Sequence, residues 1–497
     1  MGKNLPEKLK ENREKLWIAG ICFLAAIAFI TIYSYSTSPR YPYYYGSDSA
    51  QFQTMGMAWA AGKIPYRDVF DHKGPMAFLP DMVSYALFGS NFGLYLIQIL
   101  CMFIDLAAVF QISWLFIKGK GACFVAVAIT AAVFAMDFLG GNFGEEYCLP
   151  FVFVSILFQL KFLKRQDTAQ DHDPKYALLY GIAFGICLFS KVTNALSLCI
   201  GVLVILVVLL LRKKFRNILK NAAAFIAGTL IIAVPFSVYF LTKGCFSDMM
   251  YAMLTYNVKY QMVMTSWPDY ADGDTWYQFF LYYFPYYCVV FTALLNIRAR
   301  DFKMLAYNLM ILVFGGYFFF DGTMGSQYMF MMMPNIPILL GEIFALPAEK
   351  EKDLRFVQIF LLGLVCAVCY EVLPTLIRYP VSVRLQYQEK PARAYDVLLE
   401  GVPGQERDSF IAWGGSDLKD IYLLNDIVPY YKYFAIQAWH ASFDPNVYED
   451  IKNLYAAGDV TWILADDSTG LIQDTLDTRY FIVGQNEGYT LYHINWE

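Results

Sequence analysis

The chain has 497 residues, of which 58% are hydrophobic and only 16% charged, and its mean hydropathy is +0.41. Charged residues make up about a quarter of an ordinary soluble domain, so this composition excludes a string of soluble domains and indicates a polytopic α-helical membrane protein. The net charge of −5 is small for this length and predicts no nucleic-acid partner.

Eleven apolar runs are candidates for membrane-spanning helices. A bilayer core about 30 Å thick requires about 20 mostly apolar residues in a helix. The first run has no small-residue cleavage site, so we expect a retained anchor and not a signal peptide. The runs cover residues 16–36, 91–117, 121–139, 147–163, 176–190, 195–211, 221–241, 277–297, 303–320, 327–346 and 355–377.

The distribution of Lys and Arg orients these runs. Cytoplasmic loops of membrane proteins carry an excess of both residues. With the N-terminus in the cytoplasm, 22 Lys and Arg lie in inner segments and seven in outer loops, and the alternation holds at every loop. Because the number of spans is odd, the C-terminus is predicted to lie outside the cytoplasm.

The composition becomes polar from about residue 378. Short alternating runs at 409–414, 460–466, 480–484 and 489–494 predict strands, and residues 445–457 predict an amphipathic helix between them. We therefore predict a membrane domain at 1–377 and a small α/β domain at 378–497 on the outer face.

The first outer loop, residues 38–90, concentrates charge next to the lipid-facing segments. Within it, Pro75 suits the first turn of a helix over 76–87, and Gly89 suits its end. The apolar residues of that helix share one face, with Asp81 and Ser84 off it, so we expect it to lie in the membrane interface. The charged residues of the loop include Asp48, Arg67, Asp68, Asp71, His72 and Lys73.

Two further outer segments carry charge. Glu145 and Glu146 are adjacent where the chain re-enters the bilayer, and on a helix such neighbours point about 100° apart, so both cannot face one site. Lys191, at the outer end of the fifth run, either extends toward the membrane surface or binds a phosphate. For the two glutamates, the alternative to a substrate role is a solvated rim.

The motifs in these segments resemble a known family. Asp48 follows the first apolar run, GKIPYRDVFDHKGP occupies residues 62–75, and EEYCLPF occupies residues 145–151. Together they resemble the GT-C superfamily of integral-membrane glycosyltransferases, in the bacterial branch related to protein O-mannosyltransferases and aminoarabinose transferases. The resemblance covers about residues 15–377.

The resemblance implies that a sugar moves from a polyprenyl-phosphate carrier to an acceptor at the outer face of a bacterial cytoplasmic membrane. It implies that Asp48 is the catalytic carboxylate and that Lys73 faces the donor phosphate. Two positions depart from the family. Gly74 stands where relatives more often have Pro, and Ser49 follows Asp48 where relatives often have a second acidic residue, which weakens the case for a metal.

Structural alternatives accompany these assignments. Asp48 could instead form a turn or cap a helix, and Lys73 could be a solvated lysine beside headgroup phosphates. Asp71 and His72 could shape the turn before the Pro75 helix. Arg67 is a candidate substrate-binding residue, but it could pair locally with Asp68, which is a weak surface effect.

The sequence assigns no metal site and no cofactor, although it leaves a divalent cation open. The four histidines form no HExxH motif. Two DxD triplets, Asp171/Asp173 and Asp272/Asp274, are weak signals for a metal-bound nucleotide sugar. The ten cysteines, all before residue 378, show no disulfide framework.

We therefore predict a membrane glycosyltransferase with Asp48 as general base. Its partners would be a polyprenyl-phosphate-linked sugar donor, a cell-envelope acceptor (lipid, glycan or protein) and membrane lipids. The alternative is a transporter or flippase for an envelope precursor, although such proteins commonly have repeated halves, which this chain lacks. A third alternative is a scaffold whose outer domain binds cell-wall polymer.

Overall fold

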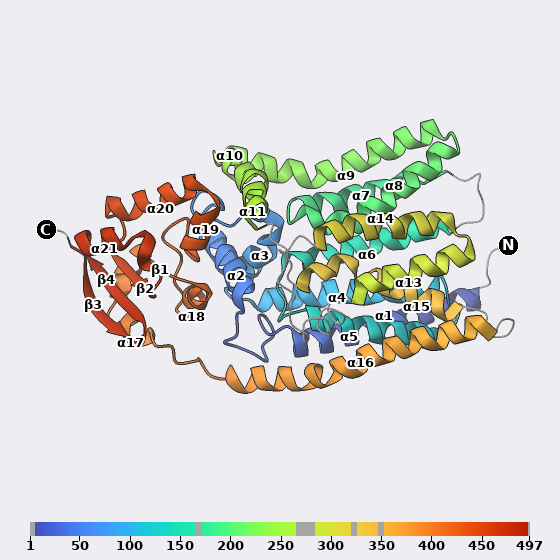
Figure 1. Cartoon of the computed structure of the whole chain (residues 1–497), viewed down its shortest axis with the longest axis horizontal. Coiled ribbons are helices and arrows are strands. Elements are labelled where there is room, and N and C mark those ends of the chain that lie inside the picture. Colours follow the sequence, from blue (N-terminus) through green and yellow to red (C-terminus); the bar gives the residue numbers. More distant parts are fainter. Residues whose placement is uncertain (1–4, 165–170, 265–283, 320–325, 346–351, 496–497) are drawn as a thin grey trace. The chain divides into compact units, whose positions relative to one another are not determined.

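The computed structural model describes residues 5–164, 171–264, 284–319, 326–345 and 352–495. The chain forms two compact units, each built from separate stretches of sequence. The helical unit comprises Met1–Ser34, Tyr95–Pro235 and Trp267–Ser382, and the mixed unit comprises Tyr35–Leu94, Phe236–Ser266 and Val383–Glu497. Figure 1 labels the helices and strands of both units.

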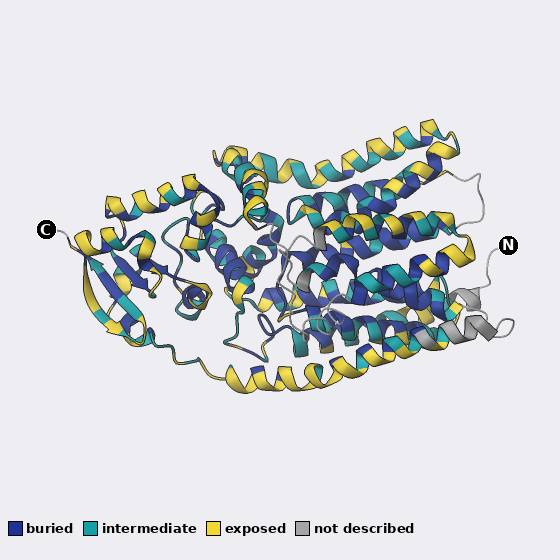
Figure 2. Ribbon diagram, in the orientation of Figure 1, coloured by how far each residue is buried: buried dark blue, intermediate teal, exposed yellow. Residues whose placement is uncertain are grey.

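The helical unit consists of apolar helices, among which α6 packs against α7 and α8. The side chains of α6 are mostly buried, whereas α9, and α16 from Leu361 to Gln386, bury few of theirs (Figure 2), as suits helices that face lipid. The unit contains all or most of α1 (Leu5–Tyr33), α4 (Phe92–Trp114), α5 (Lys120–Asp137), α6 (Gly144–Leu163), α7 (Pro174–Leu188), η2 (Val192–Ala195), α8 (Leu196–Leu211), α9 (Phe215–Thr242), α13 (Phe284–Ala299), α14 (Phe302–Phe319), η4 (Ser326–Met332), α15 (Asn335–Ala345) and α16 (Lys352–Gln386), and the ends of α4, α9 and α16 extend into the mixed unit.

A multi-pass membrane protein is confirmed. Among the described residues, seven helices are long and apolar enough to cross a bilayer, and four shorter apolar helices accompany them. Each of the eleven predicted runs overlaps one of these helices. The shorter helices include α7 and α15, so a total of eleven complete spans stays a prediction.

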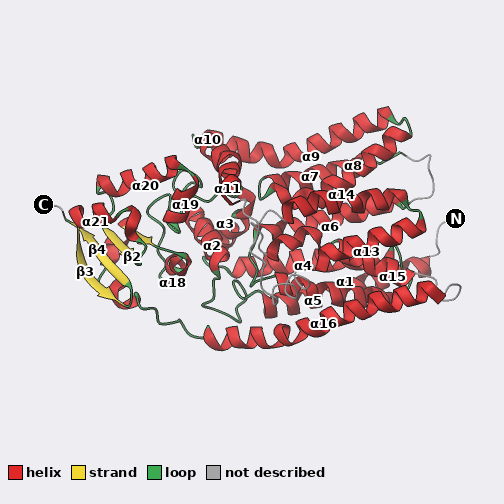
Figure 3. Cartoon of the chain, viewed as in Figure 1, coloured by secondary structure: helices red, strands yellow, loops and turns green. Residues whose placement is uncertain are grey.

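The mixed unit combines short helices with the protein's small sheet (Figure 3). Its first helices are α2 (Ser47–Ala60), η1 (Pro75–Ala77), α3 (Leu79–Phe88), α10 (Phe246–Met250), the π-helical η3 (Tyr251–Tyr256) and α11 (Asn257–Met264). The C-terminal part adds α17 (Asp396–Leu399), η5 (Gly404–Ser409), β1 (Phe410–Trp413), η6 (Ser416–Leu418), α18 (Ile421–Leu424), α19 (Gln437–Phe443), α20 (Pro445–Ala457), β2 (Trp462–Ala465), η7 (Thr469–Leu471), α21 (Gln473–Arg479), β3 (Tyr480–Asn486) and β4 (Tyr489–Ile494).

The sheet has the strand order β1-β2-β4-β3. β1 and β2 are parallel, with Phe410 opposite Trp462, and the remaining pairs are antiparallel. Every residue of β1 and β2 is buried, which explains their continuous apolar sequences. The amphipathic helix predicted at 445–457 is α20, which buries Val447, Ile451 and Tyr455 at helical spacing. The predicted small α/β sheet is therefore confirmed.

The helix predicted at 76–87 begins at Pro75 as a single 3₁₀ turn and continues as α3. It ends at Gly89, whose φ of 63° places it in the left-handed region. Asp81 and Ser84, which were expected off the apolar face, are fully buried: Asp81 packs on α2, and Ser84 hydrogen-bonds the Ser90 carbonyl and the Leu94 amide. A Cβ on Gly56 of α2 would lie 2.2 Å from that of Asp81, so only glycine permits this approach.

Candidate active site

α2 carries Asp48 in its first turn. Gly46, with a φ of 69°, occupies the N-cap position, so the alternative of Asp48 as a helix cap does not describe the structure. Instead the Asp48 side chain is 41% exposed, and its Oδ1 lies 3.6 Å from Lys419 Nζ. A carboxylate in the first turn is also favoured by the positive end of the helix dipole. Asp48 is thus held in place and still open to solvent.

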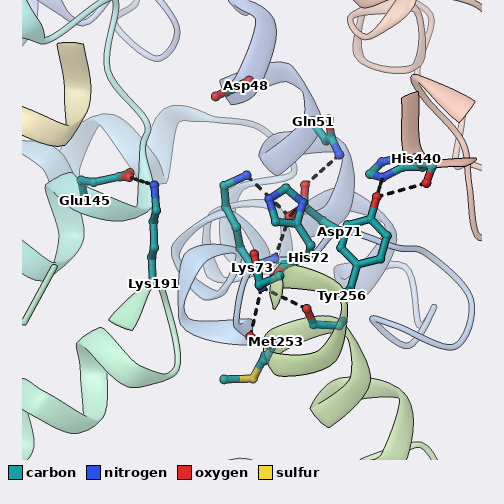
Figure 4. Close-up of polar contacts among 12 residues, drawn as sticks. Asp48, Gln51, Asp71, His72, Lys73, Glu145, Lys191, Met253, Tyr256 and His440 are labelled. Atoms are coloured by element: carbon teal, nitrogen blue, oxygen red, sulfur yellow. Dashed lines mark hydrogen bonds and ion pairs between the residues drawn. The ribbon is translucent and has the colours of Figure 1, made fainter. Parts of the chain in front are cut away.

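Asp71 is the buried centre of the charged cluster (Figure 4). Its Oδ2 accepts a hydrogen bond of 2.7 Å from Gln51 of α2, and its Oδ1 accepts one of 2.9 Å from the Lys73 amide. Burial alone would raise the pKa of Asp71. The Lys73 ammonium, His72, the Lys73 amide and His440 outweigh burial and lower that pKa to about 2. Asp71 is therefore ionised at neutral pH and too weakly basic for proton abstraction.

Lys73 is positioned by its surroundings on three sides. Its Nζ lies 3.7 Å from Asp71 Oδ1 and 4.8 Å from the ring centre of Phe52. Its backbone carbonyl accepts a 2.7 Å hydrogen bond from the Tyr66 hydroxyl. With 19% of its side chain exposed, Lys73 is not the freely solvated lysine that the sequence allowed as an alternative. A cation held this way can bind a phosphate with little loss of side-chain entropy.

His72 and His440 belong to an aromatic layer beside this cluster. The His72 ring lies 5.5 Å from Tyr260 and 5.9 Å from Trp439, centre to centre, and its carbonyl accepts a 2.7 Å hydrogen bond from Asn257. Burial lowers the pKa of His440 to about 4, partly opposed by Asp71, so His440 is neutral at pH 7. These contacts hold the 71–73 turn in place.

Arg67 forms the local pair that the sequence offered as its alternative. Its Nε lies 2.8 Å from Asp68 Oδ1, and Asp68 Oδ2 accepts a 2.8 Å hydrogen bond from the Ile64 amide. The Arg67 side chain is 49% exposed. The pair closes the turn at 64–69 and leaves the guanidinium at the surface.

Glu145, Glu146 and Lys191 belong to the helical unit. Lys191 Nζ lies 3.2 Å from Glu145 Oε1 and 3.2 Å from the centre of the Tyr328 ring. Glu146 Oε2 accepts hydrogen bonds from Gln98 at 3.0 Å and from the Asn142 amide at 2.9 Å. The two glutamates thus point to different partners, as helix geometry predicts. Both are buried, so the solvated-rim alternative is wrong.

No group of three or more metal-ligating side chains occurs in the described parts of the chain. Asp171 pairs with Lys214, and Asp173 caps α7 and pairs with Lys175, so the first DxD triplet has structural roles. The second, Asp272/Asp274, lies outside the described residues.

Sequence reasoning missed Gln51, Tyr256, His440 and Lys419. Gln51 follows Asp48 by three residues, so helical spacing would have placed both on one face of α2. Tyr256 donates or accepts a 3.1 Å hydrogen bond with His440 Nδ1, and this pair joins distant segments. The sequence around His440 and around Lys419 contains no motif that would connect either residue with residues 48–73.

Comparisons with known proteins bear on this arrangement. The family model described as dolichyl-phosphate-mannose-protein mannosyltransferase matches residues 72–241, about a third of the chain. ArnT from Cupriavidus metallidurans in the apo state has a TM-score of 0.55 at 12% identity, covering 95% of this chain and 97% of that chain. The same protein bound to undecaprenyl phosphate has a TM-score of 0.53 at 13% identity, with the same coverage.

The archaeal oligosaccharyltransferase AglB from Archaeoglobus fulgidus, in complex with an inhibitory peptide and a dolichol-phosphate, has a TM-score of 0.48 at 12% identity. It covers 98% of this chain and 75% of that chain. No curated protein matches the chain.

The helical architecture with its appended sheet is that of the GT-C membrane glycosyltransferases, as the motifs predicted. The matched family model assigns the same class of enzyme, so the protein is a polytopic membrane glycosyltransferase. Within this class it resembles the branch of protein mannosyltransferases and aminoarabinose transferase-like proteins.

Proposed function

We propose that this glycosyltransferase moves a sugar from a polyprenyl-phosphate-linked donor to a cell-envelope acceptor, with Asp48 as general base. The observation that carries the proposal is the partly exposed Asp48 carboxylate at the start of α2. In the same helix, Gln51 hydrogen-bonds Asp71, which in turn pairs with Lys73. One fold relative, ArnT, was solved with undecaprenyl phosphate, which supports a lipid-phosphate donor.

The chemistry is a direct displacement that inverts the sugar. The acceptor hydroxyl oxygen attacks the anomeric carbon, its proton passes to Asp48, and the bond from that carbon to the phosphate oxygen breaks. Polyprenyl phosphate leaves with the bonding electrons. A positioned base contributes roughly 10²–10⁴-fold to such a reaction. Lys73 would stabilise the negative charge that develops on the phosphate.

The remaining assignments belong to the same proposal. The membrane domain spans 1–377, with its catalytic loop at 38–90, and the domain at 378–497 lies outside the cytoplasm. The charge distribution supports a bacterial cytoplasmic membrane location with the N-terminus inside. Asp71 and His72 would contribute to substrate binding by holding Lys73. The other proposed substrate-binding residues are Arg67, Glu145, Glu146 and Lys191.

A transfer assay tests this function directly. The purified protein, reconstituted in vesicles with a polyprenyl-phosphate sugar and envelope extracts as acceptor, should yield free polyprenyl phosphate and a covalently glycosylated product. Mass spectrometry would identify both. Movement of the intact donor across the vesicle membrane without any transfer product would instead establish the transporter alternative.

Replacing Lys73 by Gln should weaken binding of polyprenyl phosphate by about 10- to 100-fold. A charge-assisted hydrogen bond contributes roughly 1.5–3 kcal/mol, and Gln removes the charge while keeping a polar side chain that is one atom shorter. Titration of detergent-solubilised protein with the lipid phosphate would measure the change.

Lys243→Gln is the matched control, because Lys243 is an exposed lysine of the same unit. Equal affinities for the Lys73 variant, the Lys243 variant and the unchanged protein would refute the phosphate role of Lys73.

A further inference from the structure

Lys419 is a buried cation that the C-terminal part of the chain places at the start of α2. It follows η6 directly, and only 7% of its side chain is exposed. Its Nζ lies 3.1 Å from Ser47 Oγ and 3.6 Å from Asp48 Oδ1. Among the described residues, Asp48 is the one carboxylate within ion-pair distance of Lys419. Ser47 and Lys419 are 372 residues apart in sequence.

Burying a lysine in this position costs free energy, and a function would explain why it is kept. Burying an ammonium group loses its hydration, and an apolar side chain of similar size would often be at least as stable. The neighbouring carboxylates do not explain the burial, since Asp420 pairs with Arg393 at 2.7 Å and Asp417 is exposed. The contact that accounts for Lys419 is the one with Asp48.

Lys419 contacts only one of the two carboxylate oxygens of Asp48, as suits a general base. Lys419 reaches Oδ1, and within the described residues no side chain hydrogen-bonds Asp48 Oδ2. One oxygen is thus held while the other remains open to an acceptor hydroxyl. Because Lys419 is almost fully buried and Asp48 is 41% exposed, a substrate can reach Asp48 more readily than it can reach Lys419.

We propose that Lys419 is a positioning residue that orients the Asp48 carboxylate, so that the C-terminal part of the chain completes the transfer site. The inference rests on the proposed function, in which Asp48 is the base. It also assigns the C-terminal part a role in catalysis that is separate from binding a large acceptor.

The charge of Lys419 provides a readout. Burial lowers the pKa of Lys419, opposed by Asp48 and Asp71, while Lys73 lowers it further. Ser47 and Asp48 of α2 contact Lys419, and Asp71 and Lys73 of the loop and His440 of α19 interact with it electrostatically. The cationic form orients Asp48, so activity should fall as pH rises through the lysine's pKa. Arginine stays charged over this range.

The experiment compares Lys419→Met and Lys419→Arg in the full-length protein, using the transfer assay and polyprenyl-phosphate titration. K419M should lower kcat roughly 10- to 100-fold, a size typical of a misoriented catalytic group, without changing affinity for the lipid phosphate. K419R should restore most of kcat and shift the alkaline decline of activity to higher pH. Lys390→Met, at an exposed lysine of the same part of the chain, should have no effect.

Three outcomes would overturn the inference. One is an unchanged kcat for K419M. Another is a loss of lipid-phosphate affinity at constant kcat, which would make Lys419 a phosphate ligand. The third concerns K419R, which also serves as the test if K419M does not fold. If the alkaline decline of activity in K419R occurs at the same pH as in the unchanged protein, Lys419 does not position Asp48.

The Asp48→Asn variant separates this inference from the function on which it rests. Full activity of that variant would refute the proposed base whatever Lys419 does. An inactive Asp48→Asn together with a fully active K419M would refute only the role of Lys419. In the double variant, Lys419→Met should cause no further loss of kcat beyond that of Asp48→Asn, because the carboxylate that Lys419 positions is already absent.

Discussion

Replacing Asp48 by Asn should lower the rate of sugar transfer by roughly 10²–10⁴-fold, the contribution of a positioned general base. The amide has the size and shape of the carboxylate but cannot take a proton from the acceptor hydroxyl. Asp48 is not a helix cap, but the substitution leaves the buried Lys419 without its carboxylate partner, so some stability should be lost and the variant's folding is checked first. The rate would be measured with a purified polyprenyl-phosphate sugar at saturating concentration.

Two controls make this result specific. Asp408→Asn changes an exposed carboxylate of the same unit and should leave the rate unchanged. Binding of polyprenyl phosphate to the Asp48 variant should stay within a few-fold of normal, because Lys73 and Asp71 are untouched. Normal turnover by a well-folded Asp48→Asn protein would rule out this residue as the base.

Replacing Asp71 by Asn should lower the free energy of unfolding by on the order of 2 to 4 kcal/mol. The change leaves the Lys73 ammonium without its buried carboxylate partner. It also removes the acceptor of one hydrogen bond, either that from the Lys73 backbone amide or that from the Gln51 side chain. Transfer should fall as well, since the 71–73 turn then holds Lys73 less firmly. Unfolding in detergent would be followed by heat or denaturant.

The pH dependence of this effect has a definite sign. The folded state lowers the pKa of Asp71 from 3.8 to about 2, so its ionised form stabilises the fold. This stabilisation is complete above about pH 4 and disappears as pH falls toward 2. The difference between the unchanged protein and the Asn variant should therefore be constant near neutrality and shrink in acid. Asp467→Asn, at an exposed position, should show no such difference. A pH-independent difference would contradict the ionised state of Asp71.

The parts of the fold that sequence predicts are those with a strong periodic signal. The apolar runs stand out because lipid requires long uncharged helices, and the strands of the C-terminal sheet stand out by alternation. α2 has no comparable pattern, because it buries Gln51 and Gln53 through hydrogen bonds to Asp71 and to the Ser36 carbonyl. Its burial depends on tertiary partners that composition does not reveal.

In the candidate site, too, the residues in local motifs could be predicted from the sequence and those contributed by distant segments could not. Asp48 and Lys73 were found because they fall in motifs, and Asp71 because it lies between them. Lys419 and His440 lie more than 300 residues away in sequence and approach the loop only in the folded chain. α3 illustrates a different difficulty, since its polar residues Asp81 and Ser84 face inward. When polar residues have partners inside the protein, polarity does not identify the exposed face of a helix.

Two carboxylates, Asp48 and Asp71, and two ammonium groups, Lys73 and Lys419, give the cluster a balanced charge. A donor phosphodiester brings one negative charge. In the proposed reaction the proton of the acceptor would neutralise Asp48, while the departing phosphate would gain a second negative charge. The reaction therefore relocates one negative charge from the base to the leaving group, and the total stays constant. A site that keeps its total charge fixed avoids building up uncompensated charge, which is most costly where the surroundings have a low dielectric constant.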